Sequence, residues 1–131
     1  MWEDVHIAIQ GGTVDVMLTH EAVNGGTTRV DDIVSHPNHR LFTDYGLMAS
    51  ARSRGVVTKA WDLISPSVLF HGHMHVKDEH RLPDLRRVYS MAADERDGNI
   101  GILDLADLSW RWITPNSATQ GLLPHQGASP S

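Results

Sequence analysis

The strongest constraint on the fold is a strand–helix–strand pattern. Residues 14–19 form a largely apolar run that predicts a central strand, and residues 68–70 form a second run that predicts a buried strand. Between them, residues 43–64 carry an apolar stripe with helical spacing, and Pro66 ends this predicted helix. Because such crossovers are right-handed in nearly all sheets, we expect the two strands to lie parallel in one sheet.

Both predicted strands run directly into histidines. The first is followed by His20, and the second continues into residues 71–75, which read HGHMH. The carboxyl ends of parallel strands meet at one edge of an α/β sheet, so we expect His20, His73 and His75 to gather there. Neutral imidazole is the commonest metal ligand in proteins, and Gly72 is expected to provide a tight turn beside the ion. The alternative is a surface loop whose histidines cap the sheet edge.

Composition limits the classes of function. The chain has 131 residues, of which 40% are hydrophobic and 21% charged, so it predicts one globular domain. Its net charge of -5, without a long basic run, argues against an anionic membrane surface, and against nucleic acid except as a substrate. There is no cysteine, so a metal must be held by His, Asp, Glu, Asn or water. No apolar run approaches the roughly 20 residues that cross a bilayer, and the start lacks a secretory signal, so we expect a cytoplasmic protein.

The remaining N-terminal elements are a helix and a long loop. Residues 2–10 have a helical apolar stripe that ends at Gly11, which is typical of a helix C-terminus. A helix this early, with no strand before it, is unusual for a complete α/β domain, so we expect a missing upstream part. Residues 22–38 contain turn signals and predict a loop that covers the site or selects the substrate. Gly46 and Gly55 weaken the later helix and leave a break near either one open.

The C-terminal part predicts short strands and a tail. Residues 76–85 are charged and irregular. Three short runs that predict strands follow, at residues 87–92, 99–105 and 109–113. Turn signals between these runs predict a terminal antiparallel meander. Trp110 and Trp112 share one face of its last strand and are expected to pack in the core or to cover an exposed sheet edge, with a ligand platform as the alternative. The end of the chain has little to bury, so we expect an ordered domain over residues 1–113 and a disordered tail over residues 114–131.

Three stretches of the chain also carry a family resemblance. They are DVMLTH at residues 15–20, LFHGHMH at residues 69–75 and NIGILDL at residues 99–105. The first two resemble the last two signature blocks of the calcineurin-like metallophosphoesterases, and the third is similar to the sheet-closing strand of that family. The resemblance covers residues 2–113. It implies an α/β fold, a partial α/β/β/α sandwich whose mixed sheet is followed by a C-terminal antiparallel meander.

The resemblance also implies a metal-dependent reaction. In that family two divalent ions activate a bridging water, which attacks the phosphorus of a phosphate mono- or diester. By resemblance, His20 and His73 would bind one ion and His75 the other, with Mn, Fe, Zn or Ni as the metal. No catalytic side chain is implied beyond these metal ligands.

Three further residues would support the ligands in such a site, namely Glu21, His71 and Gly72. Glu21 would hydrogen-bond a ligand imidazole from behind, which fixes the orientation of the ring. A solvated loop carboxylate is the alternative for Glu21, and ordinary packing of the strand is the alternative for His71.

One difference from the family is as informative as the match. The family's N-terminal half contributes an Asp-x-His block, a Gly-Asp block and an Asn-His block of the form Gly-Asn-His, and we expect all of them to be missing here. Three neutral histidines without a bridging carboxylate leave the charge of two dications uncompensated. We therefore expect a C-terminal half that needs a separate N-terminal half or self-association. The isolated chain should bind one metal weakly, with little turnover.

Two other functions remain open. His73, His75 and Glu79 have the histidine–glutamate spacing of a cupin-like barrel, which would bind a single metal ion. The other possibility is a non-catalytic fragment or interaction domain whose exposed sheet edge pairs with another chain.

Overall fold

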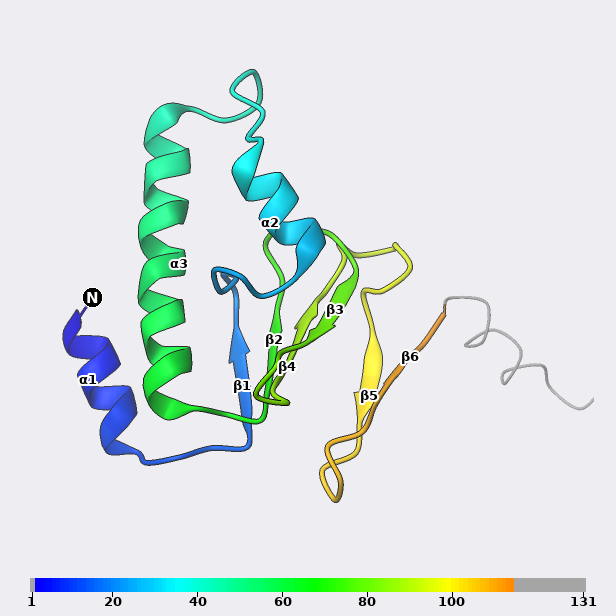
Figure 1. The fold of residues 1–131 in the computed structure, drawn as a ribbon. Helices are drawn as coiled ribbons and strands as arrows, with labels where there is room; N and C mark the ends of the chain where they lie inside the picture. Colours follow the sequence, from blue (N-terminus) through cyan, green and yellow to red (C-terminus); the bar gives the residue numbers. More distant parts are fainter. Residues whose placement is uncertain (1, 115–131) are drawn as a thin grey trace, which may run out of the picture.

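A mixed four-stranded sheet lies at the centre of the computed structural model, which describes residues 2–114 (Figure 1). The strands are β1 (Val16–Thr19), β2 (Val68–His71), β3 (Asp78–Arg81) and β4 (Arg87–Ser90). Their spatial order is β1-β2-β4-β3. β1 and β4 each pair with β2 in parallel, and β3 is antiparallel to β4. The predicted parallel pairing of the two strands that precede the histidines is therefore confirmed.

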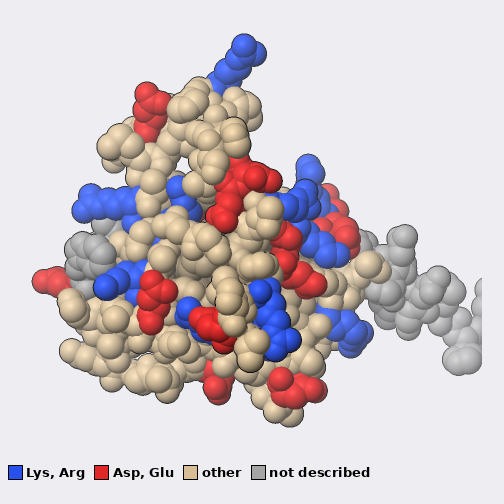
Figure 2. All heavy atoms as spheres, in the orientation of Figure 1, with Lys and Arg blue, Asp and Glu red and all other residues tan. Residues whose placement is uncertain are grey.

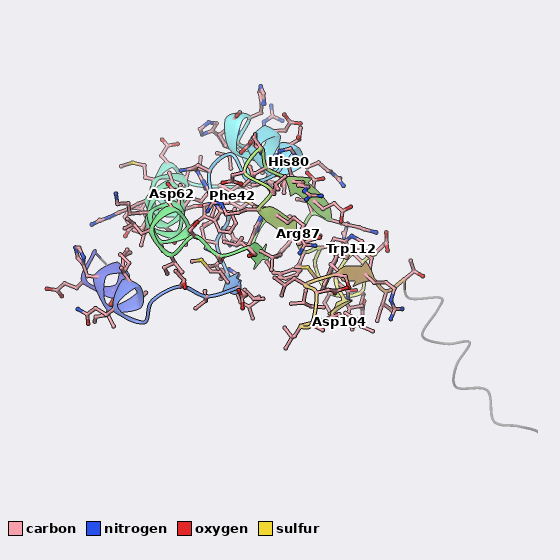
Figure 3. All side chains as sticks on the ribbon, turned by 60° about the horizontal axis from the view of Figure 1, so that its bottom comes forward. Phe42, Asp62, His80, Arg87, Asp104 and Trp112 are labelled. Atoms are coloured by element: carbon pink, nitrogen blue, oxygen red, sulfur yellow. The ribbon has the colours of Figure 1, made fainter. Side chains whose placement is uncertain are left out.

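Two helices lie on one side of this sheet. α1 (Trp2–Gln10) packs against α3 (Asp44–Ile64), as Figures 1 and 3 show. Trp61 of α3 packs on Leu69 of β2 and Val88 of β4, and all three side chains are buried. Burial of this apolar stripe attaches α3 to the sheet, at roughly 1.5–3 kcal/mol for each large side chain removed from water.

The long helix is continuous. The Thr43 hydroxyl accepts a hydrogen bond from the Gly46 N–H at 3.1 Å and so caps the N-terminus of α3. At the other end, Ser65 takes a left-handed conformation and its N–H bonds the Trp61 carbonyl. The break that Gly46 and Gly55 left open does not occur, because both glycines lie inside the single helix α3.

An antiparallel hairpin covers the opposite face of the sheet. It consists of β5 (Gly101–Leu103) and β6 (Trp110–Trp112). The Trp110 ring lies over Phe70 of β2 with centroids 4.6 Å apart, and Phe70 stacks on Tyr89 of β4 at 4.9 Å. Trp112 joins the same apolar cluster, so the predicted core role of both tryptophans is confirmed. The molecule therefore has three layers, formed by helices, sheet and hairpin (Figures 1 and 3).

Three predictions for the connecting segments are wrong. A short helix, α2 (Thr28–Ser35), forms inside the predicted loop 22–38, where the sequence is polar and Val30 is the buried residue. β3 forms inside the predicted irregular segment 76–85, because a charged strand can sit at an exposed sheet edge. β4 belongs to the central sheet, so the predicted meander is reduced to the hairpin of β5 and β6 in the described part of the chain.

The predicted tail lies outside the described residues, apart from Thr114. No helix in the described range 2–114 is both long enough and apolar enough to cross a bilayer.

Candidate functional site

The carboxyl edge of the central sheet brings two histidines together. Thr19 of β1 pairs with His71 of β2. The register continues beyond the strands, because the Gly72 N–H donates to the His20 carbonyl at 3.2 Å. The His20 Nε2 and His73 Nδ1 atoms lie 3.1 Å apart, and the two rings meet edge to face with centroids 4.9 Å apart. The expected meeting of His20 and His73 at this edge is thus found.

A buried carboxylate lies on the other side of the His73 ring. Glu21 is 6% exposed, and its Oε2 atom lies 3.5 Å from His73 Nε2. Its Oε1 accepts a hydrogen bond from the Ala22 N–H at 2.9 Å, and Oε2 accepts one from the Ser50 hydroxyl at 2.9 Å. The Arg54 guanidinium donates to the Ser50 hydroxyl at 2.7 Å. These contacts fix the carboxylate in place, so the alternative of a solvated loop carboxylate is wrong for Glu21.

The two neighbours of His73 determine how its ring nitrogens are used. A carboxylate that faces Nε2 favours the tautomer with the proton on that nitrogen. Nδ1 then carries the free lone pair, and in the absence of metal it accepts a hydrogen bond from the Nε2–H of His20. In the other neutral tautomer of His20, which carries its proton on Nδ1, two nitrogen lone pairs would face the same point. The pair His20 and His73 can therefore hold a metal ion in chemical terms.

The sequence pattern did not identify Ser50 and Arg54, because both are polar residues that precede the apolar stripe of the predicted helix, which begins at Val57. They lie four residues apart on α3, so they share one face of the helix. Arg54 is 8% exposed, and Trp61 lies further along on the same buried side. Polar residues in register with an apolar helical stripe were the available signal.

His71 lies beneath the site at the end of β2. It is 2% exposed, and burial lowers its pKa from the usual 6.5. The contact of His71 Nδ1 with the Gly72 carbonyl at 3.1 Å opposes this effect but does not reverse it. Its Nε2 atom is buried and has no hydrogen-bond partner in the described structure. These features agree with the strand-packing alternative for His71.

The backbone of the histidine loop differs from the prediction at Gly72. His73 and His75 take left-handed φ angles of 60° and 55°, whereas Gly72 has no positive φ. A Cβ added to Gly72 would meet nothing within 4 Å. The tight turn is therefore made by the two histidines and not by the glycine. Each left-handed non-glycine residue costs about 1–2 kcal/mol, and such strain is often kept at functional sites.

His75 lies apart from the pair. It lines a separate hollow together with Arg29 and Arg96. Within residues 2–114 it makes neither a hydrogen bond nor a ring contact with His20 or His73. Moreover, no group of three His, Asp or Glu side chains in the described part of the chain is arranged to hold a metal ion.

An Asp-x-His spacing does occur near the start of the chain, at Asp4-Val5-His6. The prediction that the chain contains no such spacing is therefore wrong. This spacing lies on α1, where Val5 packs against Ala60 and Ile64 of α3 and His6 is exposed. α1 therefore does not place it at the ends of the strands, and the spacing adds no ligand to the histidine pair (Figure 1).

The cupin-like alternative depends on Glu79. This residue lies on β3, and its Oε2 atom accepts a hydrogen bond from the Trp112 indole N–H at 3.0 Å. The chain forms a mixed sheet covered by helices and not an all-β barrel. The cupin-like alternative therefore lacks both its fold and its carboxylate ligand.

Comparisons with known proteins add no family to this description. No protein-family model matches the chain, and neither a curated protein nor a solved structure matches it.

Proposed function

We propose that this chain supplies the histidine half of a divalent-metal site that hydrolyses phosphate mono- or diesters. The observation that carries the proposal is the 3.1 Å separation of His20 Nε2 and His73 Nδ1 at the ends of adjacent parallel strands. Two nitrogens that each bind one ion at about 2.1 Å lie roughly 3.0–3.4 Å apart in octahedral or tetrahedral geometry, so the pair fits a shared ion. Imidazole ligands suit Mn, Fe, Zn or Ni.

The surroundings of the pair support a ligand role. Glu21 faces the far nitrogen of the His73 ring, and a carboxylate in this position orients metal-bound imidazoles and raises their basicity. The Ser50 hydroxyl donates a hydrogen bond to that carboxylate, and the Arg54 guanidinium donates one to the Ser50 hydroxyl. The left-handed backbone at His73 costs free energy that simple surface packing does not require.

The chain's own residues position the chemistry. A bound ion would neutralise phosphate charge and lower the pKa of its water. His20 and His73 would hold the ion at the edge of the sheet, and Glu21 would keep the proton of His73 on Nε2. Because these imidazoles are neutral, the ionic charge must be offset by carboxylates from another segment, which would also bridge to a second ion.

The outer surfaces of the sheet and hairpin support a role for such a partner segment. β1 is an edge strand, and Leu18 on it is 75% exposed. Ile102 and Leu105, on and after β5, are 47% and 75% exposed. A further strand beside β1 and a helix on the hairpin would cover these side chains. Together with the helix, sheet and hairpin layers, that addition would give a complete α/β/β/α sandwich.

Metal titration of the isolated chain tests the proposal. We expect one Zn²⁺ ion to bind weakly, with changes in the ring signals of His20 and His73 in NMR spectra. His20→Ala and His73→Ala are each expected to abolish binding. His36→Ala removes an exposed histidine after α2 and should leave binding unchanged. Equal Zn²⁺ binding by all four proteins would overturn the proposal.

Turnover gives a second test. With Mn²⁺, the isolated chain is expected to leave p-nitrophenyl phosphate esters nearly untouched, because the carboxylate ligands are missing. Rapid metal-dependent hydrolysis by the chain alone would show that no further segment is needed. Absence of both metal binding and turnover would favour a non-catalytic interaction domain.

A further inference from the structure

The hollow that His75 lines lies beside the histidine loop. It has a volume of about 360 Å³ and lies between the start of α2, the segment after His73 and the loop that follows β4. The polar residues that line it are Arg29, His75, Lys77, Arg96 and Asp97. His75 is two residues beyond His73, so the loop that carries the metal-ligand pair also forms one wall of this hollow.

The hollow is basic although the chain as a whole is acidic. Arg29, Lys77 and Arg96 face a single lining carboxylate, Asp97, whereas the net charge of the chain is -5. On the face drawn in Figure 2 as a whole, Lys and Arg atoms are interspersed with Asp and Glu atoms. An excess of cations at one hollow of an acidic protein attracts anions to that place, because field lines concentrate in concave surfaces.

Two of the three cations are held in position by the fold. The Arg29 guanidinium donates to the Lys77 carbonyl at 3.0 Å, and the Arg29 N–H donates to the Asp78 carboxylate at 2.9 Å. The Lys77 ammonium pairs with Asp97 at 3.0 Å and lies 5.0 Å from the centre of the Trp112 ring. Fixed cations lose little entropy when an anion binds.

The third cation is available for a ligand. Among the described residues, none forms a side-chain hydrogen bond or ion pair with the Arg96 guanidinium. Arginine presents planar N–H donors in a fork that matches two oxygens of one phosphate group. Arg96 is therefore the residue of this hollow that is best suited to contact an anion directly.

We propose that this hollow binds a phosphate group. On the basis of the proposed function, this group is a second phosphate of a small-molecule substrate whose scissile ester lies at His20 and His73. The substrate class is then a compound with two phosphate groups, one placed by Arg96 and its neighbours and one placed by the metal-ligand pair.

Binding of inorganic pyrophosphate in the presence of EDTA tests this inference without any metal chemistry. Isothermal titration calorimetry of the chain is expected to show saturable binding that is stronger for pyrophosphate than for chloride at equal ionic strength. Arg96→Ala should weaken it about tenfold, and Arg96→Lys less, because lysine keeps the charge and loses the fork. Arg52→Ala, at an exposed position of α3, should change nothing. Undetectable binding, or equal affinity of Arg96→Ala and Arg52→Ala, would overturn the inference.

The two proposals fail separately. Arg96→Ala is expected to keep Zn²⁺ binding, and His20→Ala is expected to keep pyrophosphate binding in EDTA. If pyrophosphate binding depends on Arg96 while Zn²⁺ binding does not depend on His20, the phosphate site stands and the metal site falls. If Zn²⁺ binding depends on His20 while pyrophosphate binding does not depend on Arg96, the metal site stands and the proposed phosphate site is wrong.

Discussion

The two faces of the central sheet have different chemistry. Towards the hairpin, Phe70 and Tyr89 stack on each other, and both contact the tilted ring of Trp110 in an apolar cluster. Towards α3, an apolar core lies under most of the sheet, but its carboxyl end contains a buried carboxylate, Glu21, and a buried imidazole, His71. The hairpin face therefore supplies stability, whereas the helix face gives up part of its apolar burial to support groups at the site.

This division follows from alternation along the strands. Successive residues of β2 point to opposite faces, so Val68 and Phe70 face the hairpin while Leu69 and His71 face α3. The last inward position on the helix side is thus a histidine, next to the loop that carries His73. Polar groups can be buried there because Ser50 of α3 donates a hydrogen bond to Glu21, and Arg54 of the same helix donates one to Ser50.

The largest expected effect concerns the hairpin face. Phe70→Ala removes a ring that is 7% exposed, stacked on Tyr89 and in contact with Trp110, so it should lower the free energy of unfolding by about 3–5 kcal/mol. Phe42→Ala is the matched control, because Phe42 is 57% exposed, and it should change stability by at most about 0.5 kcal/mol. Urea unfolding measures both. Similar losses for the two variants would contradict the assignment of stability to this face.

The next effect concerns the helix face. Glu21→Gln keeps the hydrogen-bonding shape but removes the charge that faces His73, so Zn²⁺ affinity should fall about 10- to 100-fold. Glu79→Gln is the control, since that carboxylate holds Trp112 instead. Calorimetric titration of both variants checks the difference. A larger loss of Zn²⁺ affinity in Glu79→Gln than in Glu21→Gln would indicate that the metal site lies on β3.

A smaller effect is expected in the histidine loop. His75 has a φ of 55°, so His75→Gly should be more stable than His75→Ala by up to about 1 kcal/mol, as glycine tolerates the left-handed region. Gly72→Ala should be nearly neutral, because its backbone is not left-handed and a Cβ finds free space. Urea midpoints of the three variants measure this. A strongly destabilised Gly72→Ala would show that the turn depends on the glycine after all.

The smallest expected effect is a change of stability with pH, which involves one proton on His71. Burial lowers the pKa of His71 in the folded chain, so as the pH falls the unfolded chain binds this proton first. This contribution to stability is therefore complete above the unfolded pKa near 6.5 and is lost progressively as the pH falls towards the lowered folded pKa. In metal-free buffer, thermal unfolding of His71→Gln should show a weaker decline below pH 6.5 than the wild type. His80→Gln changes an exposed ring (Figure 3) and should keep the wild-type decline; an equal flattening in both would contradict the role of burial.

Most of the predicted elements came from local patterns. The helical stripe before Pro66 and the apolar run that follows it identify α3 and β2. Both signals are local, because the spacing of apolar residues and a proline that ends a helix can be read from neighbouring residues. α2 and β3 escaped prediction for the same reason: each is short and polar, and each is stabilised mainly by the elements beside it.

The sequence by itself determined that His20 and His73 would lie close together, because each follows one of two strands whose helical crossover makes them parallel. The tertiary structure alone decided how the site is built. It placed Ser50 and Arg54 behind Glu21, and it separated His75 from the pair. The physical reason is that a strand–helix–strand unit and its parallel pairing follow from local patterns, whereas the direction of a side chain depends on backbone angles and on neighbours that are distant in the sequence.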